Sequence, residues 1–392
     1  MKILVLTKRQ YMGKDLVNDR FGRFRELPLE LAKLGHEVTG VALSYRPKDE
    51  DTFIDSDSTG KGRVTWRSLN LTRGAVPRPG RFANHATEWA AAFKPDLVWA
   101  CSDAYHAIFG RWLGKCLRTK CVIDLYDNFE AFAATKLPVV LPLFRRAVRH
   151  ADGVTCFSRR LADYVIHAYP REKPTVVIEN GVRKDLFHPL DRQKCRQHFG
   201  LPQNATIVGT AGALNRSRGI KTLFRAFEIL PCEREDLHLA LAGPLGRGIR
   251  IPIHPGVHYL KNLPHEEVSF FYNALDLSVI CYRHSAQGEF SFPQKAYEIM
   301  ACRVPLVAAA VGSMNELLSG HSECLYASED PASLAAAIRL QFKRRTILDR
   351  EVPSWADSAK VLEGFFKSVI NRETGQPAQE RLGASPSSPT IR

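Results

Sequence analysis

Long apolar segments are missing from this sequence of 392 residues. No stretch approaches the roughly 20 apolar residues of a membrane-spanning helix, and "VPLVAAAVG" (304–312) is among the longest apolar runs. The opening "MKILVLTKRQ" returns to charged side chains too soon for a signal peptide and is typical of a first β-strand. We therefore expect a protein without membrane-spanning helices.

Several chemistry-bearing motifs are also missing. The nine cysteines have no short paired spacing, which argues against zinc and dithiol sites and favours free thiols in a reducing cytoplasm. No G-x-G-x-x-G motif is present, which makes a nicotinamide dehydrogenase improbable. Nothing is similar to a helix-turn-helix, a zinc finger or an aromatic RNA-binding motif, so we expect no specific nucleic-acid partner.

Acidic residues are fewer than basic ones. With 55 Lys and Arg against 41 Asp and Glu, the formal net charge is +14, which favours anionic partners such as anionic lipid or phosphorylated small molecules. The content of 45% hydrophobic and 24% charged residues is that of an ordinary globular protein. The length predicts two domains rather than one.

Short apolar strands alternate with segments of helical period along both halves of the chain. This pattern predicts an α/β protein whose parallel sheets are covered by helices on both faces, the doubly wound Rossmann-like arrangement. The predicted strands are 2–7, 37–44, 96–101, 121–126, 153–158 and 174–181, then 205–214, 237–243, 257–263, 275–282 and 304–310. We expect domains at 1–180 and 181–353, a helix at 354–371 and a disordered tail at 372–392, which is rich in Pro, Ser and Gly.

Four segments resemble, in the right order, signatures of the retaining glycosyltransferases of the GT-B type, family 4 in particular. They are "RELPLELAKLGHEVTGVAL" (25–43), "VIENGVRKDLFHP" (177–189), "GTAGALNRSRGIKTLFRAF" (209–227) and "EFSFPQKAYEIMACRVPLVAAAVGSMNELL" (289–318). The resemblance covers residues 1–371 and implies two domains facing across a cleft. It places a nucleotide sugar on the second domain and the acceptor on the first, and it implies that the helix at 354–371 crosses back to the first domain.

The resemblance implies a retaining, metal-independent glycosyltransferase. The donor would be a UDP- or GDP-linked sugar, no further cofactor is expected, and the acceptor would be a saccharide or lipid-linked molecule of cell-surface polysaccharide or glycolipid biosynthesis. Two alternatives stay open: a non-catalytic subunit that binds nucleotide sugar, and a nucleotide-sugar epimerase of the same fold. The first is supported by Ala213 and Phe290, which stand where the family usually has Arg and Glu. The second is disfavoured because no acid/base cluster accompanies the donor motif.

A basic turn follows the first strand of the second half. It contains Arg216, Arg218 and Lys221, after a glycine, Gly212, that would let the backbone approach a ligand. By themselves these residues are typical of a solvated turn. The resemblance implies instead that Arg218 binds the diphosphate, since a guanidinium group offers a fork of donors suited to phosphate, with Arg216 as a substitute for the missing cation.

The donor motif carries the remaining predicted site residues of the second domain. The resemblance implies that Glu298 accepts hydrogen bonds from the ribose hydroxyls, a task for which a carboxylate is suited, and that Lys295 is a charge partner for the phosphates or for Glu298. The position for the sugar-binding glutamate falls on Phe290, and Glu289 comes one residue too early. Either a local shift brings Glu289 to the sugar, or backbone N–H groups of Phe290, Ser291 and Phe292 replace it.

On the acceptor side, "VIDLYDNFEAF" (122–132) places Tyr126 and Asp127 where the family has His-Asp. Asp124, Asp127 and Glu130 form an acidic cluster after a strand, which is either a ligand site or simply an acidic helix start. His106 follows another strand end and is a weaker candidate, because a lone histidine is more often structural.

A mixed apolar and basic segment, "LPVVLPLFRRAVRHADG" (137–153), is the candidate membrane contact. An amphipathic basic helix would gain from apolar insertion and from attraction to anionic lipid, which would place the protein peripherally on the inner face of the plasma membrane. Packing of this helix against another helix is an equally good interpretation of its period.

Overall fold

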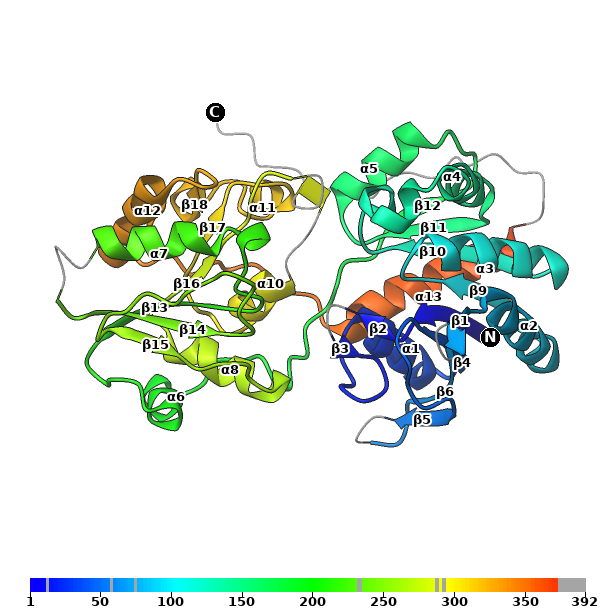
Figure 1. Cartoon of the computed structure of the whole chain (residues 1–392), viewed down its shortest axis with the longest axis horizontal. Helices are drawn as coiled ribbons and strands as arrows, with labels where there is room; N and C mark the ends of the chain where they lie inside the picture. The colour runs from blue at the N-terminus through cyan, green and yellow to red at the C-terminus, as the bar shows by residue number, and fades with distance from the viewer. Residues whose placement is uncertain are drawn as a thin grey trace, which may run out of the picture.

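The computed structural model describes residues 1–11, 14–56, 59–73, 76–230, 235–285, 289–290 and 294–372. These residues form two α/β domains that lie side by side and are joined by two extended segments (Figure 1). The predicted fold class is confirmed. Apart from Arg372, the tail predicted to be disordered lies outside the described residues.

The first domain is built on a sheet of eight strands in the order β12-β11-β10-β9-β1-β4-β6-β5. Neighbouring strands are parallel except at the edge, where β5 runs antiparallel to β6. The strands are β1 (Lys2–Lys8), β4 (Glu37–Ser44), β5 (Thr52–Ser56), β6 (Arg63–Asn70), β9 (Leu97–Ala100), β10 (Lys120–Leu125), β11 (Gly153–Cys156) and β12 (Thr175–Val177). Two short hairpins lie outside this sheet: β2 (Gln10–Tyr11) with β3 (Lys14–Asp15), and β7 (Thr72–Arg73) with β8 (Val76–Pro77).

Helices cover both faces of this sheet, which explains why its central strands are apolar throughout their length. The helices of the domain are α1 (Arg23–Lys33), α2 (Pro79–Phe93), α3 (Ala104–Cys116), α4 (Val140–His150) and α5 (Arg159–Ala168), with 3-10 turns η1 (Phe129–Ala131) and η2 (Ala133–Lys136). None of the described helices is long and apolar enough to cross a bilayer.

The second domain has a six-stranded parallel sheet in the order β15-β14-β13-β16-β17-β18. Its strands are β13 (Thr206–Ala211), β14 (Leu237–Ala242), β15 (Val257–Tyr259), β16 (Leu277–Ile280), β17 (Leu306–Ala309) and β18 (Leu325–Tyr326). Its helices are α6 (Arg192–Phe199), α7 (Ile220–Ile229), α8 (His265–Ala274), α10 (Gln294–Ala301), α11 (Ser313–Leu317) and α12 (Pro331–Lys343), with turns η3 (Arg216–Arg218) and η4 (Ser322–Cys324).

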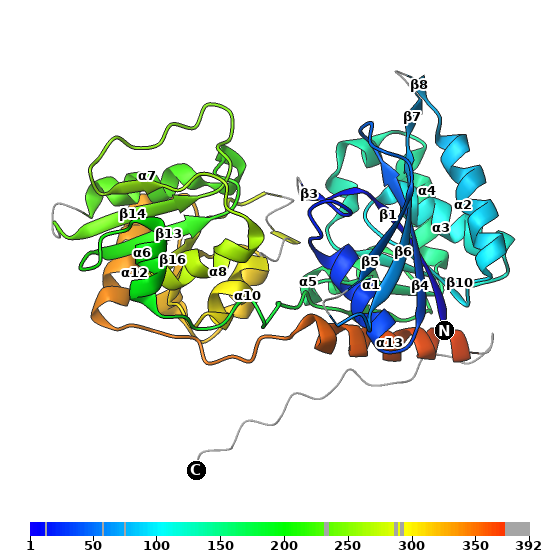
Figure 2. The same cartoon turned by 90° about the horizontal axis from the view of Figure 1, so that it is seen from below.

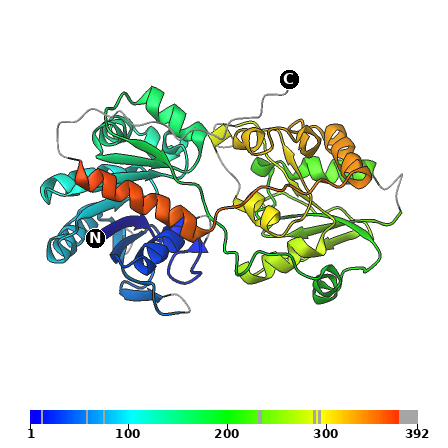
Figure 3. The same ribbon diagram turned by 180° about the vertical axis from the view of Figure 1, so that it is seen from behind.

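The chain returns to the first domain through α13 (Trp355–Asn371), which lies across that domain in Figures 2 and 3. Its apolar face is part of the first domain's core, where Phe366 contacts Trp99 with ring centroids 5.6 Å apart. The two segments that join the domains pair in a parallel bridge between Val182 and Ser354. A Cβ atom at Gly181 would lie 2.4 Å from the carbonyl carbon of Ser354, so only glycine allows this approach.

The structure departs from the predicted fold mainly at the edge of the first domain. There β5, β6 and α2 occupy a region for which no element was predicted, and β5 is antiparallel in a sheet expected to be parallel. The burial of β6 alternates along much of its length because one of its faces is only partly covered, so it lacks the continuous apolar run by which the other strands are recognised. Helices α6 and α8 in the second domain were also not predicted.

Candidate functional site

Glu298 lies on the buried side of α10 and is only 7% exposed. Burial raises the pKa of its carboxyl group to about 7, and the nearby Lys295 ammonium only partly opposes this effect. The described residues donate no side-chain hydrogen bond to this carboxylate. With no such donor, the Glu298 carboxylate keeps its capacity to accept hydrogen bonds from a bound molecule.

Lys295, one helical turn before Glu298, reaches the carboxyl end of β13. Its Nζ atom donates a hydrogen bond of 3.0 Å to the carbonyl oxygen of Ala211. The next residue, Gly212, has φ +106°, and a Cβ atom there would lie 3.4 Å from Lys295 Nζ. Burial lowers the pKa of Lys295 to about 8, and the positive charge of Arg218 adds to this shift.

Arg218 brings a second cation to the same place from η3, at the start of α7. Its backbone N–H is held by Asn215 Oδ1 at 2.9 Å, and its guanidinium group lies 4.8 Å from the centre of the Tyr282 ring and hydrogen-bonds the Tyr282 hydroxyl. Among the described carboxylates, none lies within salt-bridge distance of either Arg218 or Lys295. The structure therefore places Arg218, Glu298 and Gly212 near Lys295.

The other basic residues predicted at this site lie apart from these cations. Arg216 is exposed and extends toward the neighbouring loop. A Cβ atom built at Gly248 of that loop would lie 3.6 Å from Arg216 Nη2. Lys221 is exposed on α7. Ser291 and Phe292 lie outside the described residues.

Glu289 and Phe290 contact the first domain, an arrangement that the sequence analysis did not predict. The Glu289 carboxylate forms an ion pair with Arg160 of α5. The Phe290 ring packs beside Tyr164 of the same helix, with centroids 5.2 Å apart. The charge of Glu289 is thus already paired across the two domains, and its contact with the transferred sugar stays a prediction.

The predicted acidic cluster of the first domain is split by the structure. Asp124 is fully buried and forms a two-pronged salt bridge with Arg23, at 2.7 and 3.0 Å, so it supports the core. Glu130 is bound by Arg145 and by Tyr164, at 2.8 Å each. Asp127 is buried, accepts a hydrogen bond of 2.8 Å from the backbone N–H of Asn128, and interacts electrostatically with Arg218 of the second domain.

His106 is a correction to the predicted acceptor site. Its side chain is fully buried at the start of α3, where Nδ1 lies 2.7 Å from Asp103 Oδ1. A ring without exposed surface cannot contact an acceptor. Tyr126 does lie at the end of β10, where its hydroxyl accepts a hydrogen bond of 2.8 Å from Lys8 Nζ.

Three residues near Tyr126 were not predicted as site residues: Lys8, Tyr45 and Asp103. Lys8 is the last residue of β1, and Tyr45 and Asp103 come just after β4 and β9; these strands follow β10 in the sheet order β10-β9-β1-β4. Ligands of doubly wound sheets bind beyond the carboxyl ends of the strands. This rule, applied to every predicted strand, would have identified them.

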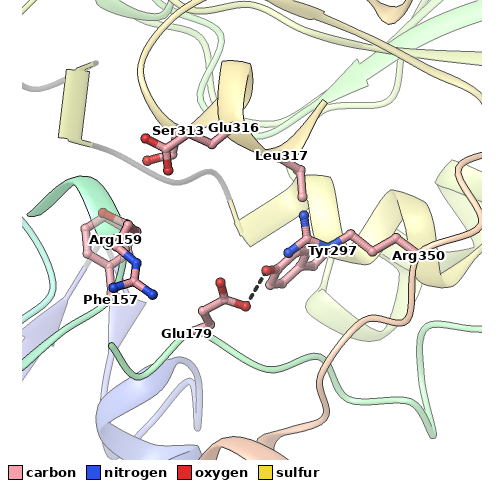
Figure 4. Close-up of a pocket in the computed structure, with 9 residues that line it drawn as sticks. Phe157, Arg159, Glu179, Tyr297, Ser313, Glu316, Leu317 and Arg350 are labelled. Carbon is pink, nitrogen blue, oxygen red and sulfur yellow. Dashed lines mark hydrogen bonds between the residues drawn. The ribbon is translucent and has the colours of Figure 1, made fainter. Parts of the chain in front are cut away.

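A cavity of about 190 Å³ lies where the two domains meet, beside the connecting segments (Figure 4). The Tyr297 hydroxyl crosses it to donate a hydrogen bond of 2.6 Å to Glu179 of the first connection. Gln294 Nε2 donates a bond of 2.6 Å to the carbonyl oxygen of Gly181 in the same connection. Helix α10, which carries Lys295 and Glu298, is thereby bound to the first connecting segment between the domains.

In the part of the chain that the structure describes, no group of three or more His, Cys, Asp or Glu side chains is arranged to hold a metal ion.

Two family models match the chain, one on each domain. The model described as Glycosyltransferase Family 4 matches residues 23–186, and the model described as Glycosyl transferases group 1 matches residues 205–342. Among curated relatives, a D-inositol 3-phosphate glycosyltransferase of Corynebacterium kroppenstedtii is 27% identical over 92% of this chain and 88% of its own. Another, D-inositol 3-phosphate glycosyltransferase 1 of Catenulispora acidiphila, is 29% identical over 58% of this chain and 60% of its own. The match spans 60% of the length of this relative. It spans 48% of D-inositol 3-phosphate glycosyltransferase 2 of the same organism and 44% of the D-inositol 3-phosphate glycosyltransferase of Geodermatophilus obscurus.

Solved structures show the same fold at low identity. A sucrose-phosphate synthase from Thermosynechococcus elongatus superimposes with a TM-score of 0.67, at 20% identity, over 94% of this chain and 96% of its own. The Anabaena protein Alr3699/HepE, solved in complex with UDP, has a TM-score of 0.66 at 19% identity, over 94% and 97%. The motif resemblance, the two family models and the fold agree, and the chain belongs to the glycosyltransferases of the GT-B type, similar to family 4.

Proposed function

We propose that this chain transfers a sugar from a UDP- or GDP-linked donor to a saccharide or lipid-linked acceptor, with retention at the anomeric carbon and without a metal ion. The observation that carries the proposal is the pair of cations, Lys295 and Arg218, beside the buried carboxylate of Glu298. Two close cations repel each other, so a bound dianion would relieve an unfavourable arrangement. The diphosphate of a nucleotide sugar is such a dianion, and the nucleotide also carries ribose hydroxyls that could donate to Glu298.

Each residue has a distinct role in this proposal. Lys295 and Arg218 stabilise the negative charge that develops on the diphosphate as its bond to the sugar breaks. Gly212 has φ +106°, a conformation that residues with side chains rarely adopt, and the absence of a side chain lets the diphosphate approach the backbone there. Glu298 accepts hydrogen bonds from the ribose and so fixes the position of the donor. Attack from the face that the diphosphate leaves requires no protein nucleophile.

A thermal-shift panel of UDP- and GDP-sugars, measured with EDTA, tests the donor assignment. A ligand at 100 times its Kd stabilises the folded protein by about 2.7 kcal/mol, so one donor should raise the melting temperature clearly. Glu298→Ala should lose this shift and all transfer activity. A matched control is Lys343→Met, because Lys343 is exposed on α12 away from the site. A strict requirement for a divalent cation would refute metal independence, and inversion in the product's NMR spectrum would refute retention.

The non-catalytic alternative predicts a different result. A nucleotide sugar would then bind and be released unchanged, with no UDP or GDP formed in the presence of any acceptor. The paired Glu289 and the alanine at position 213 support this reading, whereas retention of Arg218, Lys295 and Glu298 supports turnover. Release of nucleotide diphosphate over time distinguishes the two.

A membrane surface as the place of action is supported by α4 and the turn before it. Leu137, Val139 and Leu143 are 57%, 68% and 43% exposed, which is unusual for large apolar side chains clustered within seven positions. Arg146 and Arg149 are exposed on the following turn of the helix. Exposed apolar residues next to arginines suit insertion into an anionic bilayer. Such a location fits an acceptor attached to lipid.

A further inference from the structure

Tyr282 lies just beyond the carboxyl end of β16, beside Arg218. In the sheet of the second domain, β16 is the strand between β13, which leads to Gly212, and β17. Ligands of doubly wound sheets bind beyond the carboxyl ends of such strands. Tyr282 is only 6% exposed, and its carbonyl oxygen accepts a hydrogen bond of 2.7 Å from Ser328 Oγ. The residue is therefore held in place at the edge of the sheet where the donor would bind.

The Tyr282 side chain contacts the Arg218 side chain in two ways. The guanidinium group lies over the ring, 4.8 Å from its centre, and Nη1 donates a hydrogen bond to the hydroxyl group. At the other end of the residue, the backbone N–H of Arg218 donates a hydrogen bond of 2.9 Å to Asn215 Oδ1. Arg218 is thus fixed both at its backbone and at its charged group.

The position of Arg218 is electrostatically unfavourable without such a contact. The positive charge of Lys295 is close enough to interact with that of Arg218, and burial lowers the pKa of both groups. Asp127 of the first domain attracts Arg218, but it forms no ion pair with it among the described residues. The face of an aromatic ring attracts a cation, more strongly where the cation has lost water. Tyr282 therefore holds the guanidinium group at a place that Lys295 would otherwise disfavour.

A tyrosine leaves the charge of Arg218 available to a ligand. A carboxylate would neutralise the guanidinium group and would occupy its paired N–H donors, which are those that suit a phosphate. Among the described residues, the Tyr282 hydroxyl is the one side-chain acceptor that the guanidinium group binds. Because a guanidinium group has five N–H donors, most of them stay available for phosphate oxygens.

We infer that Tyr282 is the positioning residue for Arg218: its ring and hydroxyl group hold the guanidinium group beside Lys295 without neutralising it. This inference rests on the proposed role of Arg218 as a ligand of the donor diphosphate. Tyr282 acts through Arg218 and requires no contact with the donor. Its removal should therefore weaken diphosphate binding only in a protein that retains Arg218.

A double-mutant cycle between Tyr282 and Arg218 tests this dependence on the full chain. Calorimetry in EDTA measures the binding of UDP, GDP and inorganic pyrophosphate. Arg218→Met should weaken binding by at least about 10-fold, and Tyr282→Leu should weaken it by about 10-fold. Tyr282→Phe keeps the ring and loses only the hydrogen bond, so it should weaken binding by about 3-fold. In the Arg218→Met background, Tyr282→Leu should change the affinity by less than about 2-fold.

Arg225→Met is the matched arginine control, because Arg225 is exposed on α7 after the same turn. It should leave the affinity unchanged, and Tyr282→Leu should have its full effect in the Arg225→Met background. Melting temperatures show whether each variant is folded. If Tyr282→Leu does not fold, the smaller effect of Tyr282→Phe is compared with and without Arg218.

Three results would overturn the inference. The first is an additive effect of Tyr282→Leu and Arg218→Met, because Tyr282 would then act on the ligand by another route. The second is unchanged affinity in folded Tyr282→Leu. The third is failure of all three probes to bind the wild type. Failure of the proposed function has a different signature: the probes bind and the cycle is non-additive, but no sugar is transferred from a UDP- or GDP-linked donor.

Discussion

Replacement of Glu298 by glutamine should stabilise the protein without ligand while it abolishes donor binding. Burial raises the pKa of this carboxyl group from 4.5 to about 7. A carboxyl group whose pKa is higher in the folded than in the unfolded protein does not lower the free energy of unfolding at low pH. As the pH rises above its unfolded pKa, the folded protein becomes less stable. Wild-type stability should therefore fall between about pH 4.5 and pH 7 because of Glu298, and glutamine removes this loss.

The size of the effect follows from the shift. A difference of roughly 2.5 pKa units at about 1.36 kcal/mol per unit corresponds to about 3 kcal/mol as an upper limit. For a domain of this size, each kcal/mol changes the melting temperature by about 2–4 °C. At pH 8 the second domain of Glu298→Gln should melt about 6–12 °C above that of the wild type, and at pH 4 the two should melt together.

Differential scanning calorimetry is the suitable assay. All five tryptophans lie outside residues 181–353, so their fluorescence follows the first domain and α13 rather than the donor domain. The exposed Glu228 on α7 provides a control, since Glu228→Gln should show no such pH-dependent gain. The reasoning is wrong if Glu298→Gln is less stable than the wild type at pH 8, or if the difference does not change with pH. A nucleotide sugar that stabilises the variant as strongly as the wild type would remove Glu298 from the donor site.

Three further outcomes are expected. Lys295→Met should weaken donor binding about 10- to 100-fold, because a charged hydrogen bond contributes about 1.5–3 kcal/mol; unchanged affinity by calorimetry would contradict this. Asp124→Ala should destabilise the first domain by about 3–5 kcal/mol, since Arg23 would be left buried without its partner. Tryptophan fluorescence during denaturation measures this loss of stability, and a loss under about 1 kcal/mol would contradict the expectation. Val139→Asp should reduce co-sedimentation with vesicles containing anionic lipid, without loss of donor binding in solution; binding that depends on neither lipid charge nor salt would exclude a membrane role for α4.

The core of the fold could be predicted from the sequence because parallel strands buried on both faces consist of continuous apolar runs. β1, β9, β13 and β17 are such strands, and each was predicted within a few residues. The edge of the first domain could not be predicted in this way. β6 carries Arg63 and Arg67 on its partly covered face, so its apolar positions alternate and resemble those of a loop with scattered hydrophobic residues.

The proposed donor site could be predicted where a single local motif determines which residues lie together. Lys295 and Glu298 are three residues apart and therefore lie on neighbouring positions of one helix, wherever that helix is placed. Arg218 follows because the turn after β13 ends beside the same helix. His106 was misjudged because its position after a strand says nothing about burial, which here depends on Phe82 and Tyr105 packing around the ring.

The fate of Glu289 shows what sequence spacing leaves undetermined. Its one-residue offset from the family's position suggested an altered sugar contact. In the structure its partner is Arg160, on a helix of the other domain, and no local sequence pattern connects the two residues. Two further contacts join the same segment to the first domain and its connection: the Phe290 ring packs beside Tyr164, and the Tyr297 hydroxyl donates a hydrogen bond to Glu179. This segment, which we propose binds the donor, thus also contacts the first domain. A substitution at Glu289 should therefore change how the two domains are held together, whereas a substitution at Glu298, buried behind this interface, should change what the second domain binds.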